Sequence, residues 1–325
     1  MYSVMDDTAD CMCSSALALN CCQFAFFTRN NKSSPRCCSY YYNDWMSKLD
    51  ANKKLRDVVM PGTHNSASST ISKWALFSAV ARCQNLQVHE QLLRGARYLD
   101  IRINNDIHIC HGMVKGGTFS DVLNEVNAFL HENENEFLIV EIKDEAPMTL
   151  SQKTRTLQLI QSTFGERMIS YSDLQSWFQL THVTMGDIRK RRKNVLVLIS
   201  NSFCFDHVAE EFSCHLHSTL LKNKWHNSDE TSDLLHSNLT HLRDLTRYDR
   251  DFLICNQFVL TPQPPCNTID AFRLLFGLRS IQPISLVRNL YRNEEILQCS
   301  VRDRPGLHWN IVSLDFIDMC EQFVR

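Results

Sequence analysis

Two histidines stand where short apolar segments end, and both are suited to moving protons. His64 follows a Pro-Gly-Thr turn in MPGTHNSAS, and His111 precedes a glycine in NNDIHICHGM. Between them lies LDIRI, which carries Arg102. One imidazole can take a proton while the other gives one, and a guanidinium offers a two-pronged donor to phosphoryl oxygens. Together these side chains suit the cleavage of a phosphodiester.

Further charged residues follow the two-residue period of a β-strand. Side chains two apart point to the same face of a strand. The pairs that share a face are Asp100 with Arg102 in YLDIRI, Glu141 with Lys143 in VEIKDE, and Ser313 with Asp315 in NIVSLDFI. Burying several charges is tolerable only if they meet, so we expect these strand ends to converge. The alternative is a set of independent surface ion pairs.

The same alternation divides the side chains of IHICH. His111 shares a face with Ile109, whereas His108 and Cys110 face the other side. Residues on opposite faces of a strand cannot bind one ion together. We therefore do not expect a metal site here.

The elements that must position these residues alternate between strand-like and helix-like segments. Apolar runs predict strands at residues 56–62, 96–103, 106–112, 137–145, 194–200, 252–262 and 310–317. Amphipathic patterns predict helices at residues 43–49, 88–95, 119–134 and 151–165. This alternation favours a mainly parallel sheet. We expect an α/β fold, a TIM-type (β/α)8 barrel with some distortion, whose C-terminal mouth gathers the polar strand ends.

Composition places the chain among globular proteins and excludes some partners. It has 325 residues, of which 44% are hydrophobic and 22% charged, with a formal net charge of −2. This length fits one large α/β domain as well as two smaller ones. The near-neutral charge gives no bulk attraction to nucleic acid. We predict one catalytic domain over residues 43–325.

Cysteines are concentrated at the N-terminus. Six of the 14 lie within the first 38 residues, and the segment lacks the basic start of an export signal. Its CxC and CC spacings differ from the CxxC of zinc sites, although cysteines beside phenylalanines could accept acyl chains. We favour an unstructured extension at residues 1–42 and reduced cysteines in a cytoplasmic protein.

Six motifs in order carry a family resemblance. They are PGTHNS, QLLRGARYLDIRI, the HG of ICHG, FLIVEIKDE, QFVLTP and NIVSLDFI. Together they resemble the X domain of phosphatidylinositol-specific phospholipases C, and most of all the small eukaryotic X-domain-containing proteins. The segment from WALFSAV to YLDIRI also resembles the trypanosome glycosylphosphatidylinositol-specific phospholipase C. The resemblance runs from about residue 44 to the C-terminus.

The resemblance implies a role for each matching residue. His64 matches the general base that removes the proton from the inositol 2-hydroxyl, and His111 matches the general acid. Arg102 matches the phosphate-binding arginine of metal-independent bacterial enzymes. Asp100 would lie beside Arg102 and His64, and Asp315 matches the carboxylate that orients the base.

The resemblance also bears on substrate binding and metal use. We assign Lys143, Asn65 and Gln257 to substrate binding. Calcium-dependent relatives carry acidic ligands where this chain has Arg102 and Lys143, so we expect no cofactor and no metal. Asn65 departs from the aspartate of the bacterial enzymes and matches an asparagine that binds calcium in other members, which keeps a metal as an open alternative.

Two further segments carry weaker signals. ISKWALFSAVARC places Ile71, Trp74, Ala75 and Phe77 at helical spacing, and we predict that Trp74 and Phe77 contact a membrane. Packing against the barrel wall is the alternative. HVAEEFSCHLHS holds several possible metal ligands at residues 207–217, but it fits no metal motif, and a polar helix face is the favoured interpretation.

The expected function is a metal-independent phosphoric diester hydrolase that cleaves phosphatidylinositol or a glycosylated form, in peripheral contact with a membrane. A catalytically weak lipid-binding protein on the same barrel is the alternative. A metal-dependent glycerophosphodiesterase barrel ranks lower, because Arg102 occupies a position where such enzymes need an acidic ligand.

Overall fold

The structure, a computed structural model, describes residues 43–176, 182–203, 211–245, 251–261 and 310–318. The predicted extension at residues 1–42 lies outside them. Within the described residues, ten strands form one sheet, and eight of them follow the order β7-β6-β5-β2-β1-β10-β9-β8. These eight strands are β1 (Met60–Thr63), β2 (Tyr98–Ile103), β5 (Leu138–Asp144), β6 (Val195–Ile199), β7 (His215–Leu216), β8 (Leu221–Lys224), β9 (Leu253–Phe258) and β10 (Ile311–Leu314).

The sheet has the strand order of a barrel. Neighbours along the order are parallel, and β1 pairs with β2 on one side and with β10 on the other. The first and last strands of the described chain are therefore adjacent, as barrel closure requires. Between β7 and β8 the described residues form no ladder, so the barrel is open there. The prediction of a distorted α/β barrel is confirmed.

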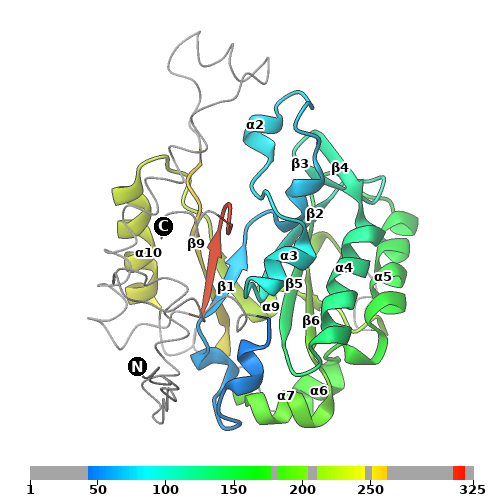
Figure 1. Cartoon of the computed structure of the whole chain (residues 1–325), viewed down its shortest axis with the longest axis vertical. Coiled ribbons are helices and arrows are strands. Elements are labelled where there is room, and N and C mark those ends of the chain that lie inside the picture. Colours follow the sequence, from blue (N-terminus) through cyan, green and yellow to red (C-terminus); the bar gives the residue numbers. More distant parts are fainter. Residues whose placement is uncertain (1–42, 177–181, 204–210, 246–250, 262–309, 319–325) are drawn as a thin grey trace, which may run out of the picture.

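Helices cover the outside of the sheet, and α3, α4 and α5 lie beside β2, β5 and β6 (Figure 1). The α-helices are α2 (Ser78–Ala81), α3 (Val88–Leu93), α4 (Phe119–Glu132), α5 (Leu150–Phe164), α6 (Tyr171–Ser176), α7 (Met185–Arg191), α9 (His217–Leu220) and α10 (Thr231–Asp244). Short 3-10 helices span Trp45–Lys48, Leu55–Asp57, Ser66–Thr70, Gly165–Arg167 and Asn201–Phe203.

The outer helices α4 and α5 begin at side-chain caps. Thr118 accepts a hydrogen bond from the Asp121 amide at the start of α4, and Thr149 forms a capping box with Gln152 at the start of α5. Such caps satisfy amides that the first helical turn leaves unpaired. The apolar face of α4 then packs on the outward side chains of the sheet.

The inward side chains change from apolar to polar along each strand. In β2, Tyr98 belongs to the inner apolar cluster, whereas Asp100 and Arg102 follow on the same face. In β5, Ile139 begins the series that continues with Glu141 and Lys143. The barrel is therefore closed by apolar side chains at its base and carries its charges towards the C-terminal mouth.

One glycine permits close packing at the base of this mouth. A Cβ atom on Gly62 of β1 would lie 2.6 Å from the Tyr98 ring, nearer than any real contact. Glycine at this position lets the tyrosine ring fit inside the barrel against the neighbouring strand.

A hairpin leaves the barrel after β2 and returns to α4. It consists of β3 (His108–His111) and β4 (Val114–Thr118), which pair antiparallel. Its glycines, Gly116 and Gly117, lie against Thr70, the last residue of the 3-10 helix Ser66–Thr70. This hairpin carries His111 to the mouth.

Three local predictions were wrong. Residues 43–49 form a 3-10 turn over Trp45–Lys48 rather than an α-helix, and the first strand begins only at Met60. Residues 71–77 are not helical, because Phe77 has φ 62° and α2 starts after it.

No described helix is long and apolar enough to cross a membrane.

The predicted polar helix face at residues 207–217 was wrong for His215, whereas His217 begins the short helix α9. His215 lies in β7, where its ring is buried and its Nε2 is 2.7 Å from the Ile169 carbonyl oxygen. His217 turns inward instead and reaches a carboxylate inside the barrel. Residues 204–210 lie outside the described part.

Candidate active site

A pocket of about 590 Å³ opens where the parallel strands end. Polar side chains from several strands and loops line it, and they include His64, Arg102, His111, Lys143, Glu145, His217, Gln257 and Asp315. Parallel barrels place their sites at this end. The predicted convergence of charged strand ends therefore exists, and the alternative of independent surface pairs does not describe it.

His64 is held at both ring nitrogens. Its Nδ1 is 2.8 Å from Asp315 Oδ1, and its Nε2 is 2.7 Å from Arg102 Nη2. Because a guanidinium only donates hydrogen bonds, Nε2 must be the acceptor and Nδ1 must carry the proton. The lone pair on Nε2 accepts from Arg102, and both residues line the pocket.

The loop after α2 holds His64 and Asp315 in position through hydrogen bonds to the backbone. Gln84 Nε2 donates to the carbonyl oxygens of His64 (3.1 Å) and Leu314 (2.8 Å), and the Phe316 amide donates to the Cys83 carbonyl oxygen (2.7 Å). The ends of β1 and β10 are thereby joined, so His64 and Asp315 keep their relative positions.

Arg102 is surrounded by carboxylates. Its Nη2 lies 3.1 Å from Asp100 Oδ2, and its Nη1 lies 2.8 Å from Glu145 Oε1. Although burial opposes the charge, Asp100 and Glu145 raise the pKa of Arg102 above its usual value. The arginine is thus a permanent cation at the mouth.

Asp100 has both oxygens engaged. Lys143 Nζ is 3.1 Å from Oδ1, and Oδ2 also accepts from the Asn65 amide at 3.2 Å. Burial by itself raises the pKa of Asp100, but the nearby Arg102 and Lys143 together hold it well below its ordinary value. Asp100 is 2% exposed and lies behind the pocket wall, so it acts by holding cations in place.

A second polar group lies deeper in the barrel around Glu141. Lys143 Nζ is 3.0 Å and His217 Nδ1 is 2.9 Å from this carboxylate, which also accepts a hydrogen bond from the Tyr98 hydroxyl. Burial works against ionisation, yet Lys143 and His217 lower the pKa of Glu141. Lys143 therefore joins the two carboxylates, Asp100 and Glu141.

His111 stands across the pocket from His64. The two ring centroids are 6.1 Å apart with the planes nearly perpendicular, and His111 Nδ1 is 3.0 Å from the Ala81 carbonyl oxygen. Nδ1 must donate to that carbonyl, which fixes the tautomer. Burial lowers the pKa of His111, and the charges of Arg102 and His64 act in the same direction.

Cys83 lies beside both histidines. Its Sγ is 3.7 Å from His111 Nδ1, and the side-chain Nδ2 of Asn65 is 3.9 Å from the same sulfur. Burial raises the pKa of the Cys83 thiol well above its usual range, so the sulfur is protonated. No feature of the sequence motifs had marked this cysteine.

The remaining predicted residues were assigned either to substrate binding or to membrane contact. Gln257 lines the pocket and donates to Asn223 Oδ1 at 2.5 Å, whereas the Asn65 side chain is fully buried and does not reach the pocket. The assignment of Asn65 to substrate binding therefore has no support in its position. Trp74 is 96% exposed and Phe77 is 37% exposed, so packing against the barrel wall does not describe Trp74.

Glu145 and His217 are site residues that the motif reasoning missed. Glu145 follows β5, and its Oε2 accepts from the Gly112 amide at 2.8 Å while Oε1 pairs with Arg102. It thus ties the hairpin that carries His111 to the arginine. The two-residue alternation that selected Glu141 and Lys143 would also have selected Glu145.

Comparison with known proteins identifies similar chains. A family model described as "Phosphatidylinositol-specific phospholipase C, X domain" matches residues 58–197. The chain is 33% identical over 121 residues to a 1-phosphatidylinositol phosphodiesterase of Listeria monocytogenes, across 37% of this chain and 38% of that protein. It is 26% identical over 325 residues to the mouse PI-PLC X domain-containing protein 2, across 90% of this chain and 88% of the mouse protein.

Solved structures share the fold. The phosphatidylinositol-specific phospholipase C from Listeria monocytogenes has a TM-score of 0.65 at 19% identity, covering 87% of this chain and 98% of that one. A Staphylococcus aureus enzyme, studied for modulation of its membrane binding, has a TM-score of 0.56 at 18% identity, covering 86% and 92%. These similarities show the barrel.

Proposed function

Because the chain belongs to the phosphatidylinositol-specific phospholipase C X-domain family, we propose that it is a phosphodiesterase that cleaves phosphatidylinositol or a glycosylated form of it. Family and fold support phospholipase C-type chemistry in general. The observation that carries the proposal is the placement of His64 between Asp315 and Arg102, opposite His111. The products are diacylglycerol and a cyclic inositol phosphate.

The first step uses His64 as the base. Its Nε2 takes the proton of the inositol 2-hydroxyl, and the oxygen attacks the neighbouring phosphorus. Asp315 stabilises the imidazolium that forms, because it accepts the hydrogen bond from Nδ1 at 2.8 Å. In this step Arg102 turns its donors from Nε2 to the phosphoryl oxygens, as a bidentate fork does.

The second step uses His111 as the acid. It gives a proton to the diacylglycerol oxygen as the phosphorus–oxygen bond breaks, so one proton is taken and one is given overall. In the free protein, burial and the cations lower the pKa of His111. A bound phosphate anion favours the protonated ring, which links substrate binding to the charging of the acid.

Calcium, which some relatives use, does not fit the residues at this mouth. A calcium ion needs six to eight oxygen ligands. Asp100 and Glu141 are already paired with Lys143, and Arg102 pairs with Asp100 and Glu145. A calcium ion bound by Asp100 and Glu141 would meet the fixed positive charges of Arg102 and Lys143, so the phosphate is neutralised by the guanidinium instead.

We assign membrane contact to the loop that precedes α2, beside the mouth of the barrel. Trp74, Leu76 and Phe77 are exposed on the segment between the 3-10 helix Ser66–Thr70 and α2. Met113 is exposed on the hairpin that carries His111. Apolar side chains of this kind bind at the interface of a bilayer. We place the protein at the cytoplasmic surface of a membrane, with its four described cysteines reduced.

Hydrolysis of phosphatidylinositol vesicles in excess EGTA tests this function. We expect release of water-soluble inositol phosphate at a rate that added calcium does not change, and its loss in His64→Ala. Vesicle binding without release would favour the alternative of a catalytically weak lipid-binding protein. Release that stops in EGTA and returns with calcium would contradict the proposed mechanism.

A further inference from the structure

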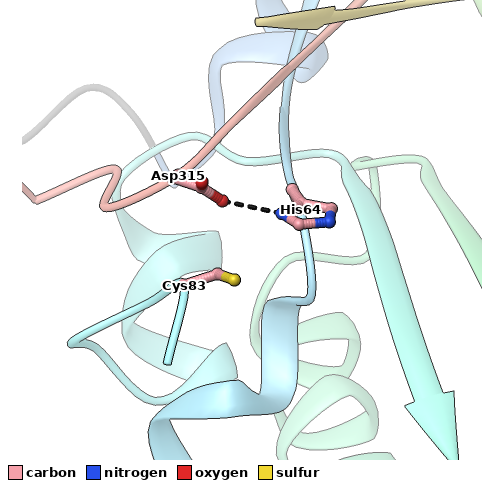
Figure 2. Close-up of side chains that lie close together, drawn as sticks. All are labelled: His64, Cys83 and Asp315. Atoms are coloured by element: carbon pink, nitrogen blue, oxygen red, sulfur yellow. Dashed lines mark hydrogen bonds and ion pairs between the residues drawn. The ribbon is translucent and has the colours of Figure 1, made fainter. Parts of the chain in front are cut away.

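Three side chains of different chemical type meet beside the pocket. A ring nitrogen of His64, Cys83 Sγ and an Asp315 oxygen lie within 4.8 Å of one another, and Nδ1 is the ring nitrogen that faces Asp315, at 2.8 Å. Figure 2 shows Cys83 and Asp315 on the same side of the His64 ring. The three residues follow β1, α2 and β10, so they come from separate parts of the sequence. We call them the His-Cys-Asp cluster.

We propose that the His-Cys-Asp cluster binds Zn²⁺, or a similar thiophilic divalent ion, and that this binding switches off the hydrolysis proposed above. Imidazole nitrogen, thiolate sulfur and carboxylate oxygen are the three kinds of protein ligand that zinc takes, usually in a tetrahedral arrangement. Cys83 and Asp315 would supply two negative charges to the dication. All three residues line the pocket, so a fourth position is open to water.

The cluster selects against the hard cations Mg²⁺ and Ca²⁺. These ions take oxygen ligands, of which this cluster has one carboxylate. Soft thiolate ligands instead favour zinc and related transition metals. The selectivity thus depends on Cys83, the residue for which the proposed hydrolysis gives no chemical task.

Inhibition follows from the tautomer of His64. In the free protein Nδ1 carries the proton and donates to Asp315, while Nε2 accepts from Arg102. A metal on Nδ1 needs the lone pair there, so the ring proton must move to Nε2 and the cysteine must release its thiol proton to solvent. Nε2 then has no lone pair for the inositol hydroxyl. The ion disables the base without having to fill the pocket.

The surroundings leave room for this change. A proton on Nε2 would face the donor Arg102 Nη2 at 2.7 Å, so the guanidinium must turn away from the ring, as it does in the proposed first step. Its other hydrogen bonds, to Asp100 and Glu145, do not involve the ring. His111 Nδ1 lies 3.7 Å from the sulfur but already faces the Ala81 carbonyl oxygen. The acid is therefore not required as a ligand.

Cobalt(II) absorption tests binding independently of activity, because a cobalt–thiolate bond gives a charge-transfer band in the near ultraviolet. Full-length wild type and Cys83→Ala are titrated with Co²⁺, and Cys110→Ala is the matched control, since Cys110 is also buried but lies on the hairpin. Other cysteines contribute equally to each spectrum. We expect a component that is lost in Cys83→Ala and kept in Cys110→Ala. Superimposable titrations of wild type and Cys83→Ala would overturn the proposal.

Inhibition by Zn²⁺ provides the second arm, with each variant compared with its own metal-free rate. Because losing even an outer-shell partner weakens a metal site about tenfold or more, we expect half-inhibition of Cys83→Ala to need at least that much more zinc. Cys110→Ala should match wild type, EDTA should restore the rate, and Mg²⁺ should not inhibit. Equal zinc sensitivity of all three proteins would contradict the inference.

The metal site can still be tested if the protein hydrolyses no inositol lipid or if Cys83→Ala does not fold. If the wild type hydrolyses no inositol lipid, the cobalt difference spectrum still decides whether the cluster binds a metal. If Cys83→Ala does not fold, Asp315→Asn is titrated in its place. Loss of the cobalt component in Asp315→Asn supports the site, and its persistence there refutes it.

Discussion

The roles of His64 and His111 predict a large loss of rate when either imidazole is removed. Replacing either by alanine should reduce hydrolysis by roughly a hundred-fold or more, the usual contribution of a general acid or base. His108→Ala is the control, because this histidine lies on the same short strand and its Nδ1 faces only the Asp106 carbonyl oxygen. Rates are measured as release of inositol phosphate, and folding by circular dichroism. If both alanine variants fold and hydrolyse at near-normal rates, His64 and His111 are not the base and the acid.

The titration of His111 reports on its neighbours. Burial lowers its pKa, and the positive charge of Arg102 lowers it further. Because the folded pKa lies below its ordinary value, the charged acid is lost at a lower pH than for an exposed histidine. In Arg102→Gln one cation is gone, so the pKa of His111 should rise, and NMR titration of the ring protons measures it. An unchanged or lower pKa would show that Arg102 does not act on this ring.

At the scale of elements, Glu145 joins the strand β5 to the hairpin β3–β4. Its carboxylate pairs with Arg102 and accepts a hydrogen bond from the Gly112 amide, next to His111, the proposed acid. A hydrogen bond to a charged group contributes about 1.5–3 kcal/mol, so Glu145→Gln should lower kcat/KM by about tenfold or more. The Gly112 amide resonance should shift as well.

Asp106→Asn is the matched control for Glu145→Gln. Asp106 is an exposed carboxylate in the turn between β2 and the hairpin, where it pairs with Lys115 of β4 at 3.5 Å, and it does not line the pocket. We expect its rate to equal that of wild type. If Glu145→Gln also leaves both the rate and the Gly112 resonance unchanged, Glu145 does not position the hairpin.

The loop before α2 predicts a separation between membrane binding and chemistry. Replacing Trp74 and Phe77 by serine should weaken binding to phosphatidylinositol vesicles more than it lowers turnover of a monomeric soluble substrate, because the ring surfaces lie outside the pocket. Leu150→Ser is the control, since Leu150 is 61% exposed at the start of α5. If vesicle binding and turnover of the soluble substrate fall equally, the loop supports the structure of the site and does not serve membrane binding.

At the scale of the whole molecule, the alternation of strands and helices was enough to predict the barrel. Parallel strands covered on both faces are nearly continuous apolar runs, which makes a segment such as 137–145 easy to recognise. The same two-residue period placed Asp100, Arg102, Glu141 and Lys143 correctly on the inner face. The short β7 and the opening of the barrel left no comparable pattern.

What could not be predicted depends on contacts between distant segments. Cys83 and Gln84 reach His64 only because a loop folds across the ends of β1 and β10. His217 belongs to a polar segment that has helical spacing, yet its ring enters the barrel to meet Glu141. Local patterns record which face a residue occupies, and they do not record which distant side chain it will meet.

The product formed from phosphatidylinositol tests the central claim most directly, because attack by the inositol 2-hydroxyl must first give a cyclic phosphodiester. Phosphorus NMR follows the reaction of dispersed phosphatidylinositol with the full-length protein in excess EGTA. We predict that a cyclic inositol phosphate is the first water-soluble phosphorus species, and that neither His64→Ala nor His111→Ala produces it at a comparable rate. An acyclic inositol phosphate as the first product, or no product at any protein concentration, would contradict the account.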